Sequence, residues 1–166
     1  MKKLRLFLNF TFLTLIFSFC GEKNTTDVPT LANITAVIKG AVNLEYSGSG
    51  IVTTSTIGNA LVLNLGTSTK INGKSYLLGV FVFFGDRVEK VGKFEFTTAS
   101  GIIPGDFAVG TFDIVEGNNK KQFLSITGYV DITMLEGTTV RGTFYFQAKE
   151  KTTGEIIEVT NGTISF

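Results

Sequence analysis

Histidine is absent from this chain of 166 residues, and cysteine occurs once, as Cys20. Without histidine, neither a Ser-His-Asp nor a Cys-His catalytic arrangement can form, and the commonest zinc ligand is missing. A single cysteine also leaves no disulfide within the chain. The sequence therefore predicts a protein that is not an enzyme and that carries no metal and no cofactor.

Charge of either sign is sparse as well. Residues 1–19 hold three of the 15 basic residues and none of the 14 acidic ones, so the rest of the chain has a net charge of −2. Proteins that bind nucleic acid need a concentrated basic face, which such a balance does not provide. Nucleic acid is therefore not an expected partner.

The first 19 residues have the pattern of an export signal. Lys2, Lys3 and Arg5 precede an apolar run from Leu6 to Phe19 that a few polar residues interrupt. A signal peptide has a basic start and an apolar core of about 7–15 residues, whereas a membrane-spanning helix needs about 20. Residues 1–19 are thus predicted to be a cleaved signal peptide.

Cys20 lies where this apolar run ends and a polar segment begins. The arrangement resembles the bacterial lipoprotein signal, in which the cysteine is acylated, with palmitate or a similar group, and becomes the first mature residue. The resemblance implies a lipidated Cys20 with a flexible tether over residues 20–30, and Gly21 in second place implies the outer membrane. An ordinary secretory signal and an uncleaved signal anchor are the alternatives.

Beyond the tether, apolar and polar residues alternate and no helical period is found. The clearest alternation runs from Leu124 to Met134, with apolar residues at the even positions. Similar alternation marks residues 93–97, 111–114 and 142–150. Such segments are typical of antiparallel strands that pack one face against a core.

Three places decide how the strands connect. Residues 34–46 keep one parity across Gly40, which favours one long strand bent there over a hairpin at the glycine. The apolar positions change parity across residues 160–163, which favours a bulge over an Asn-Gly hairpin. Asn72-Gly73 stands between two long strand-like runs and predicts a tight turn.

These strands predict one all-β domain over residues 31–166. About nine of them at this spacing, without helices, indicate a single antiparallel β-sandwich or a meandering β-barrel. A chain of about 150 residues buries enough surface to hold such a core without disulfides.

The last part of the chain, VRGTFYFQAKEKTTGEIIEVTNGTISF, carries a family resemblance. It resembles the C-terminal end of a family of small bacterial lipoproteins with an uncharacterised all-β domain, in which a Gly-Thr-Phe-x-Phe-x-Ala strand precedes a Val-Thr-x-Gly strand. The matching residues are Gly142 to Ala148 and Val159 to Phe166, and Gly110-Thr111-Phe112 and Ile126 to Thr133 are similar to two earlier strands. The resemblance covers residues 107–166 and implies the fold and the anchor, but no activity.

The segment SYLLGVFVFFG, residues 75–85, is apolar on both faces. Burying a phenylalanine contributes about 1.5–3 kcal/mol, so something should cover the second face. Either another part of the domain covers it, such as the opposite sheet or residues 47–58, or the face is a ligand or partner surface. In the second case Phe81 and Phe83 are the anchors and Tyr145 lies nearby; in a barrel, they would instead line an apolar cavity.

Carboxylates are the remaining route to chemistry. Asp113 and Asp131 both fall on polar faces of expected strands, and two carboxylates suffice for glycoside hydrolysis. The favoured interpretation is that both are solvated charges. Asp106 and other loop oxygens could hold Ca²⁺, but no Asp-x-Asp spacing supports a metal site.

The sequence therefore predicts a lipid-anchored, non-catalytic binding or structural module at the cell envelope. Its partner, besides the membrane, would be an envelope protein or a glycan. A small barrel that binds an apolar ligand is the main alternative, and a carboxylate-based glycan hydrolase is the least favoured one.

Overall fold

The computed structural model describes residues 32–98 and 105–166, and these residues form nine β-strands and no helix. The predicted signal peptide, Cys20 and the tether lie outside the described residues. The strands are β1 (Ala32–Gly40), β2 (Leu44–Ile57), β3 (Ala60–Ile71), β4 (Lys74–Phe84), β5 (Gly92–Glu95), β6 (Phe107–Glu116), β7 (Asn119–Glu136), β8 (Thr139–Glu150) and β9 (Ile156–Ser165). No helix in this part of the chain is long and apolar enough to cross a membrane.

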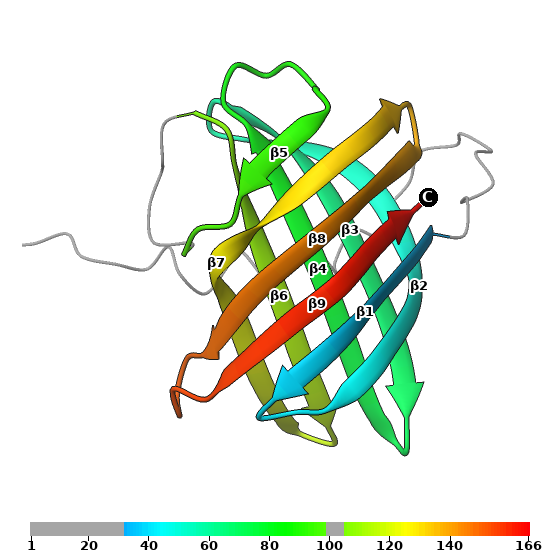
Figure 1. Ribbon diagram of the computed structural model, residues 1–166, viewed down its shortest axis with the longest axis vertical. Coiled ribbons are helices and arrows are strands. Elements are labelled where there is room, and N and C mark those ends of the chain that lie inside the picture. Colours follow the sequence, from blue (N-terminus) through cyan, green and yellow to red (C-terminus); the bar gives the residue numbers. More distant parts are fainter. Residues whose placement is uncertain (1–31, 99–104) are drawn as a thin grey trace, which may run out of the picture.

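Eight strands close into an antiparallel barrel in the order β1-β2-β3-β4-β6-β7-β8-β9, with β9 pairing back to β1 (Figure 1). The ninth strand, β5, continues the wall at β7. The first residues of the 18-residue β7 pair with β6, and Tyr129 to Ile132 pair with β5. The all-β prediction is confirmed, and of the two predicted architectures the chain adopts the barrel. Closure leaves few unpaired strand edges.

Side chains fill the interior of the barrel. One cluster of 25 buried hydrophobic residues draws members from all nine strands. Phe144, Phe146 and Ala148 of β8 point inward as predicted, as do Phe94 of β5 and Phe112 of β6. The alternation seen in the sequence thus separates an apolar interior from the outer wall.

The predicted alternation of residues 124–134 is wrong at its start. Phe123 and Ser125 point inward, whereas Ile126 is 36% exposed and Val130 is buried again. The reason is a β-bulge, since the register between β7 and β8 shifts between Ser125 and Thr127. One extra residue on β7 moves the inward positions from odd to even numbers.

The connections correct two expectations and confirm two. Residues 34–46 are not one bent strand, because β1 ends at Gly40, whose φ is +111°, and pairs antiparallel with β2. Residues 47–58 lie almost wholly in β2, in the barrel wall, and do not fold over another strand. The turn at Asn72-Gly73 is confirmed, and so is the bulge in β9, where the residue with positive φ is Asn161.

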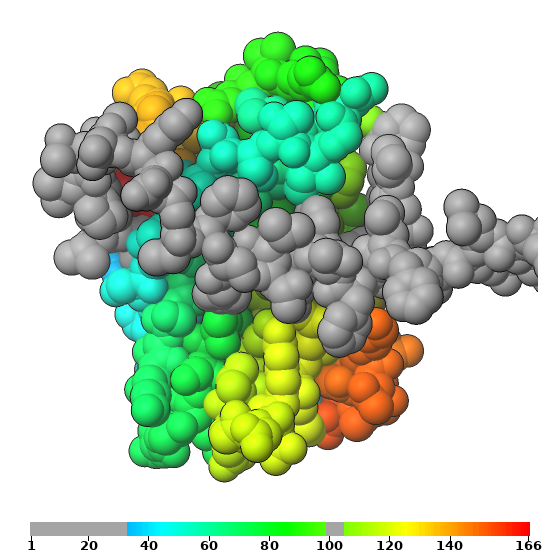
Figure 2. All heavy atoms as spheres, turned by 180° about the vertical axis from the view of Figure 1, so that it is seen from behind, coloured from blue at the N-terminus to red at the C-terminus, as the bar shows by residue number. Residues whose placement is uncertain are grey.

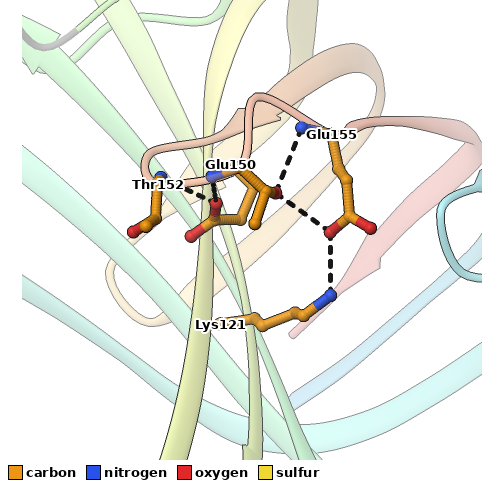
Figure 3. A network of polar contacts seen from close by, with 5 residues as sticks. Lys121, Glu150, Thr152 and Glu155 are labelled. Atoms are coloured by element: carbon orange, nitrogen blue, oxygen red, sulfur yellow. Dashed lines mark hydrogen bonds and ion pairs between the residues drawn. The ribbon is translucent and has the colours of Figure 1, made fainter.

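The two ends of the barrel differ. The upper end in Figure 1 carries the β2–β3 turn, the β4–β5 loop and the β7–β8 turn, and β1 begins and β9 ends in the same half. The lower end carries the four other turns between neighbouring strands. There the Glu150 carboxylate accepts hydrogen bonds from the backbone N–H groups of Thr152 and Thr153, and Glu155 pairs with Lys121 at 2.8 Å (Figure 3). These contacts fix the β8–β9 turn.

Candidate functional site on the outer wall

The second apolar face predicted for residues 75–85 lies on the outside of the barrel. Here Phe81 and Phe83 of β4 pack with Val62 of β3 and Val109 of β6, separately from the interior cluster. We call these four residues the phenylalanine cluster. The rings of Phe83 and Phe107 stack with centroids 4.4 Å apart and an interplanar angle of 8°.

The phenylalanine cluster offers no exposed anchor in this structure. Phe81 is 8% exposed and Phe83 is 9% exposed. The Phe81 ring lies over Gly79, within 2.9 Å of the place that a Cβ would occupy. Gly79 on the outer wall thus leaves room for the Phe81 ring, where a larger residue would clash with it.

Tyr145, predicted to lie near Phe81 and Phe83, is elsewhere. It belongs to β8, and β6 and β7 separate β8 from β4 in the barrel order. The structure therefore brings the two phenylalanines together and places the tyrosine on a different side of the wall.

Tyr145 is part of a row of side chains across four neighbouring strands, which lie side by side in Figure 1. Lys93 of β5 places its Nζ 3.9 Å from the centre of the Tyr129 ring, a cation–π contact. Tyr129 of β7 pairs directly with Tyr145, with ring centroids 6.4 Å apart. The Tyr145 hydroxyl donates a 3.0 Å hydrogen bond to Glu158 of β9. We call these four residues the tyrosine row.

The tyrosine row faces outward and is accessible. The residues next to its members along the strands, such as Phe94 and Phe144, are buried in the interior, so the row occupies the opposite face. Both tyrosines are half-buried. Burial and the bond to Glu158 raise the pKa of Tyr145, so its hydroxyl keeps its proton to a higher pH than usual.

Sequence reasoning missed Tyr129, Lys93 and Glu158 as members of this surface. Tyr129 falls on the polar face of a predicted strand, so the sequence indicated only that its side chain points outward. Its pairing with Tyr145 depends on the register between β7 and β8, which the bulges in β7 set. The alternation alone could not have placed the two rings together.

Asp113 is not the solvated charge that the sequence favoured. It lies on the outer face of β6, is 6% exposed and pairs with Lys120 at 2.9 Å. The cross-strand residue Gln122 lies near enough to favour the ionised carboxylate, although its amide nitrogen and Asp113 Oδ1 do not form a well-aligned hydrogen bond. Burial raises the pKa of Asp113, and the nearby Lys120 partly opposes this shift.

The proposed pair of carboxylates does not form. Asp113 pairs with Gln122, and Asp131 lies nine residues further along β7. At about 3.3 Å per residue this separation is about 30 Å, whereas glycoside hydrolysis requires roughly 5–10 Å. The expectation that neighbouring strands bring the two carboxylates together is therefore wrong.

Asp106 is engaged by protein groups. Its Oδ2 contacts Lys90 Nζ at 2.7 Å, and its Oδ1 accepts the backbone N–H of Gly85 at 2.9 Å. Within residues 32–98 and 105–166, no three histidine, cysteine, aspartate or glutamate side chains are grouped to hold a metal ion.

The described residues thus form a small closed β-barrel that has a filled interior and carries the tyrosine row on its outer wall. No family model, no curated protein and no solved structure matches the chain. The lipoprotein resemblance of residues 107–166 stays a prediction.

Proposed function

We propose that this chain is an exported, non-catalytic binding module held at the bacterial cell envelope, at the outer membrane, by an acylated Cys20. The apolar run before Cys20 supports export, and the polar residues after it support attachment at this position. Every described strand lies within residues 32–166, so cleavage before Cys20 would remove none of them. Two or more acyl chains attached to this one residue would suffice for stable membrane anchoring.

Mass spectrometry of the native protein tests this anchor. We expect a mature chain that begins at Cys20 and carries fatty acyl groups, and we expect Cys20→Ala to release the protein from membranes. A mature terminus at another residue, or an unmodified Cys20 thiol, would refute the anchor.

The filled interior is the observation that carries the rest of the proposal. Residues such as Phe84, Phe112, Phe123 and Phe146 are 0% exposed inside the barrel. An apolar carrier needs a chamber of several hundred Å³, and these side chains occupy that space. We therefore place binding on the outer wall and do not propose the apolar-ligand alternative.

The tyrosine row supports a glycan as the ligand. Its two rings offer apolar faces to the C–H groups of a sugar, Glu158 offers an acceptor for hydroxyls, and Lys93 offers a donor. An apolar ligand would shield Lys93 and Glu158 from water without giving them hydrogen-bond partners of its own, which is unfavourable. Tyrosine is also enriched among the residues that dominate binding at surfaces.

Co-sedimentation with purified cell-wall glycan tests the ligand. We expect the double variant Tyr129→Ala/Tyr145→Ala to bind about 30-fold more weakly, the equivalent of about 2 kcal/mol for a dominant contact. Ile51→Ala is the matched control, because Ile51 is 53% exposed on β2, away from the row. Equal binding by the double variant and the control would exclude the row as the binding surface.

A further inference from the structure

The β4–β5 loop, residues 85–91, is held firmly against the upper end of the barrel. The Arg87 guanidinium donates hydrogen bonds to the backbone oxygens of Gly58 and Asn59 in the β2–β3 turn, both at 3.1 Å. Lys90 contacts Asp86 at 3.0 Å and Asp106 at 2.7 Å. Figure 2 shows the loop (green) and the β2–β3 turn (cyan-green) next to each other at this end. The loop is therefore a fixed surface.

This fixed loop exposes two apolar side chains. Val88 is 59% exposed and Val91 is 56% exposed, the two highest values among the exposed large hydrophobic residues of the described chain. Single exposed hydrophobic residues are normal, but two within four positions on a loop held by ion pairs form a small apolar surface. Hydrogen bonds and ion pairs hold the loop in place, while the side chains of Val88 and Val91 remain exposed.

The chain enters the barrel in the same half of the molecule. β1 begins at Ala32, beside the end of β9, and 11 residues separate Ala32 from Cys20. At no more than about 3.6 Å per residue, these allow a reach of roughly 40 Å. A bilayer that holds Cys20 therefore lies within reach of the upper end of the barrel.

The charge of the loop is compatible with this orientation. Residues 85–91 contain two acidic and two basic residues, so the loop is neutral and is not repelled by anionic headgroups. At the lower end, one exposed aliphatic residue of the described chain, Ile156 at 50%, lies opposite Lys149 in the ladder.

We propose that Val88 and Val91 rest on the surface of the bilayer that carries the anchor, so that the barrel has a fixed orientation on the membrane. This proposal depends on the acylated Cys20 proposed above. Two valines contribute too little for binding alone, but the anchor holds them at the interface, where each adds to attachment.

A fluorescent probe at the loop tests this orientation. Once Cys20 is acylated the chain has no free thiol, so Val88→Cys gives one labelling site in the full acylated protein. Thr152→Cys, in the β8–β9 turn at the lower end, is the matched control. The labelled proteins are reconstituted into vesicles of phosphatidylcholine and phosphatidylglycerol and isolated by flotation.

We expect the probe at position 88 to shift its emission to shorter wavelengths and to be quenched by nitroxide-labelled lipid, and the probe at position 152 to do neither. Equal emission at both positions in floated protein overturns the orientation and leaves the anchor intact. Protein that does not float refutes the anchor, and the orientation with it. A shift that requires an added envelope protein, and is absent with lipid alone, assigns the loop to a protein partner and overturns the proposal.

Discussion

Phe112 is a fully buried member of the interior cluster, and its truncation measures how tightly that interior is packed. Phe112 is 0% exposed, and three aromatic rings surround it: Tyr46 at 6.3 Å, Tyr76 at 6.1 Å and Phe123 at 6.2 Å between centroids. Phenylalanine-to-alanine changes in cores cost about 3–5 kcal/mol, and each aromatic pair adds about 0.5–1.5 kcal/mol beyond its burial. We therefore expect Phe112→Ala to lose about 4–5 kcal/mol, near the top of that range.

Urea unfolding followed by circular dichroism measures this loss. With a slope of about 2 kcal/mol per molar urea, the midpoint should fall by about 2 M for Phe112→Ala. Phe112→Leu keeps most of the volume and loses the ring contacts, so it should cost about 1–2 kcal/mol and remains measurable if the alanine variant does not fold. Ile51→Ala, at a position 53% exposed, should change stability by less than about 0.5 kcal/mol. A loss below about 1.5 kcal/mol for Phe112→Ala, with an unchanged slope, would mean that the interior is not packed as described.

Two further predictions concern buried titratable groups. Because burial raises the pKa of Asp113, the folded state binds its proton more tightly than the unfolded state. The free energy of unfolding should therefore fall as pH rises from the ordinary value of 3.8 through the folded pKa, and Asp113→Asn should remove this dependence. At pH 7 the same variant should be about 0–1 kcal/mol more stable than the natural protein, since the partly exposed Lys120 regains water. A loss of more than about 1 kcal/mol in chemical unfolding would contradict this. Burial also raises the pKa of Tyr46 to about 12, against hydrogen bonds to Thr67 and Leu78 that lower it. Ultraviolet absorbance should show a tyrosine ionisation step near pH 12 that Tyr46→Phe removes, and stability should fall between pH 10 and pH 12. An unchanged step near pH 12 in Tyr46→Phe would contradict this assignment.

The sequence predicted the strands better than it predicted their faces. Period-two alternation identified β8 and β9, including the bulge at residues 160–163, because a change of parity is visible along one chain. It misplaced Ile126, because the bulge in β7 inserts one residue without a glycine or proline to mark it. It also preferred a bent strand at Gly40, since a hairpin can preserve parity across its turn.

The outer wall was harder to predict for a related reason. Alternation separates inward from outward positions, but it says nothing about which strands become neighbours around the barrel. Phe81 and Tyr145 share an outward orientation, yet two strands separate them. Asp113 and Asp131 share a polar face, yet half of the length of β7 lies between their levels. The distance between two outward side chains depends on the order and register of the strands around the barrel, which the alternation does not reveal.

The two proposals concern different surfaces, which meet at β5, where Gly92 separates Val91 of the loop from Lys93 of the row. The tyrosine row crosses β5, β7, β8 and β9 on the side of the barrel, whereas Val88 and Val91 lie in a loop at its upper end. A barrel that rests on a bilayer by that end leaves its side wall open to glycan. Substitutions in the loop should therefore alter orientation without changing the affinity of the row, and Tyr129→Ala should weaken glycan binding without moving the loop from the membrane. The filled interior is what makes this division necessary, because it leaves the outer wall and the ends as the surfaces through which the barrel can act.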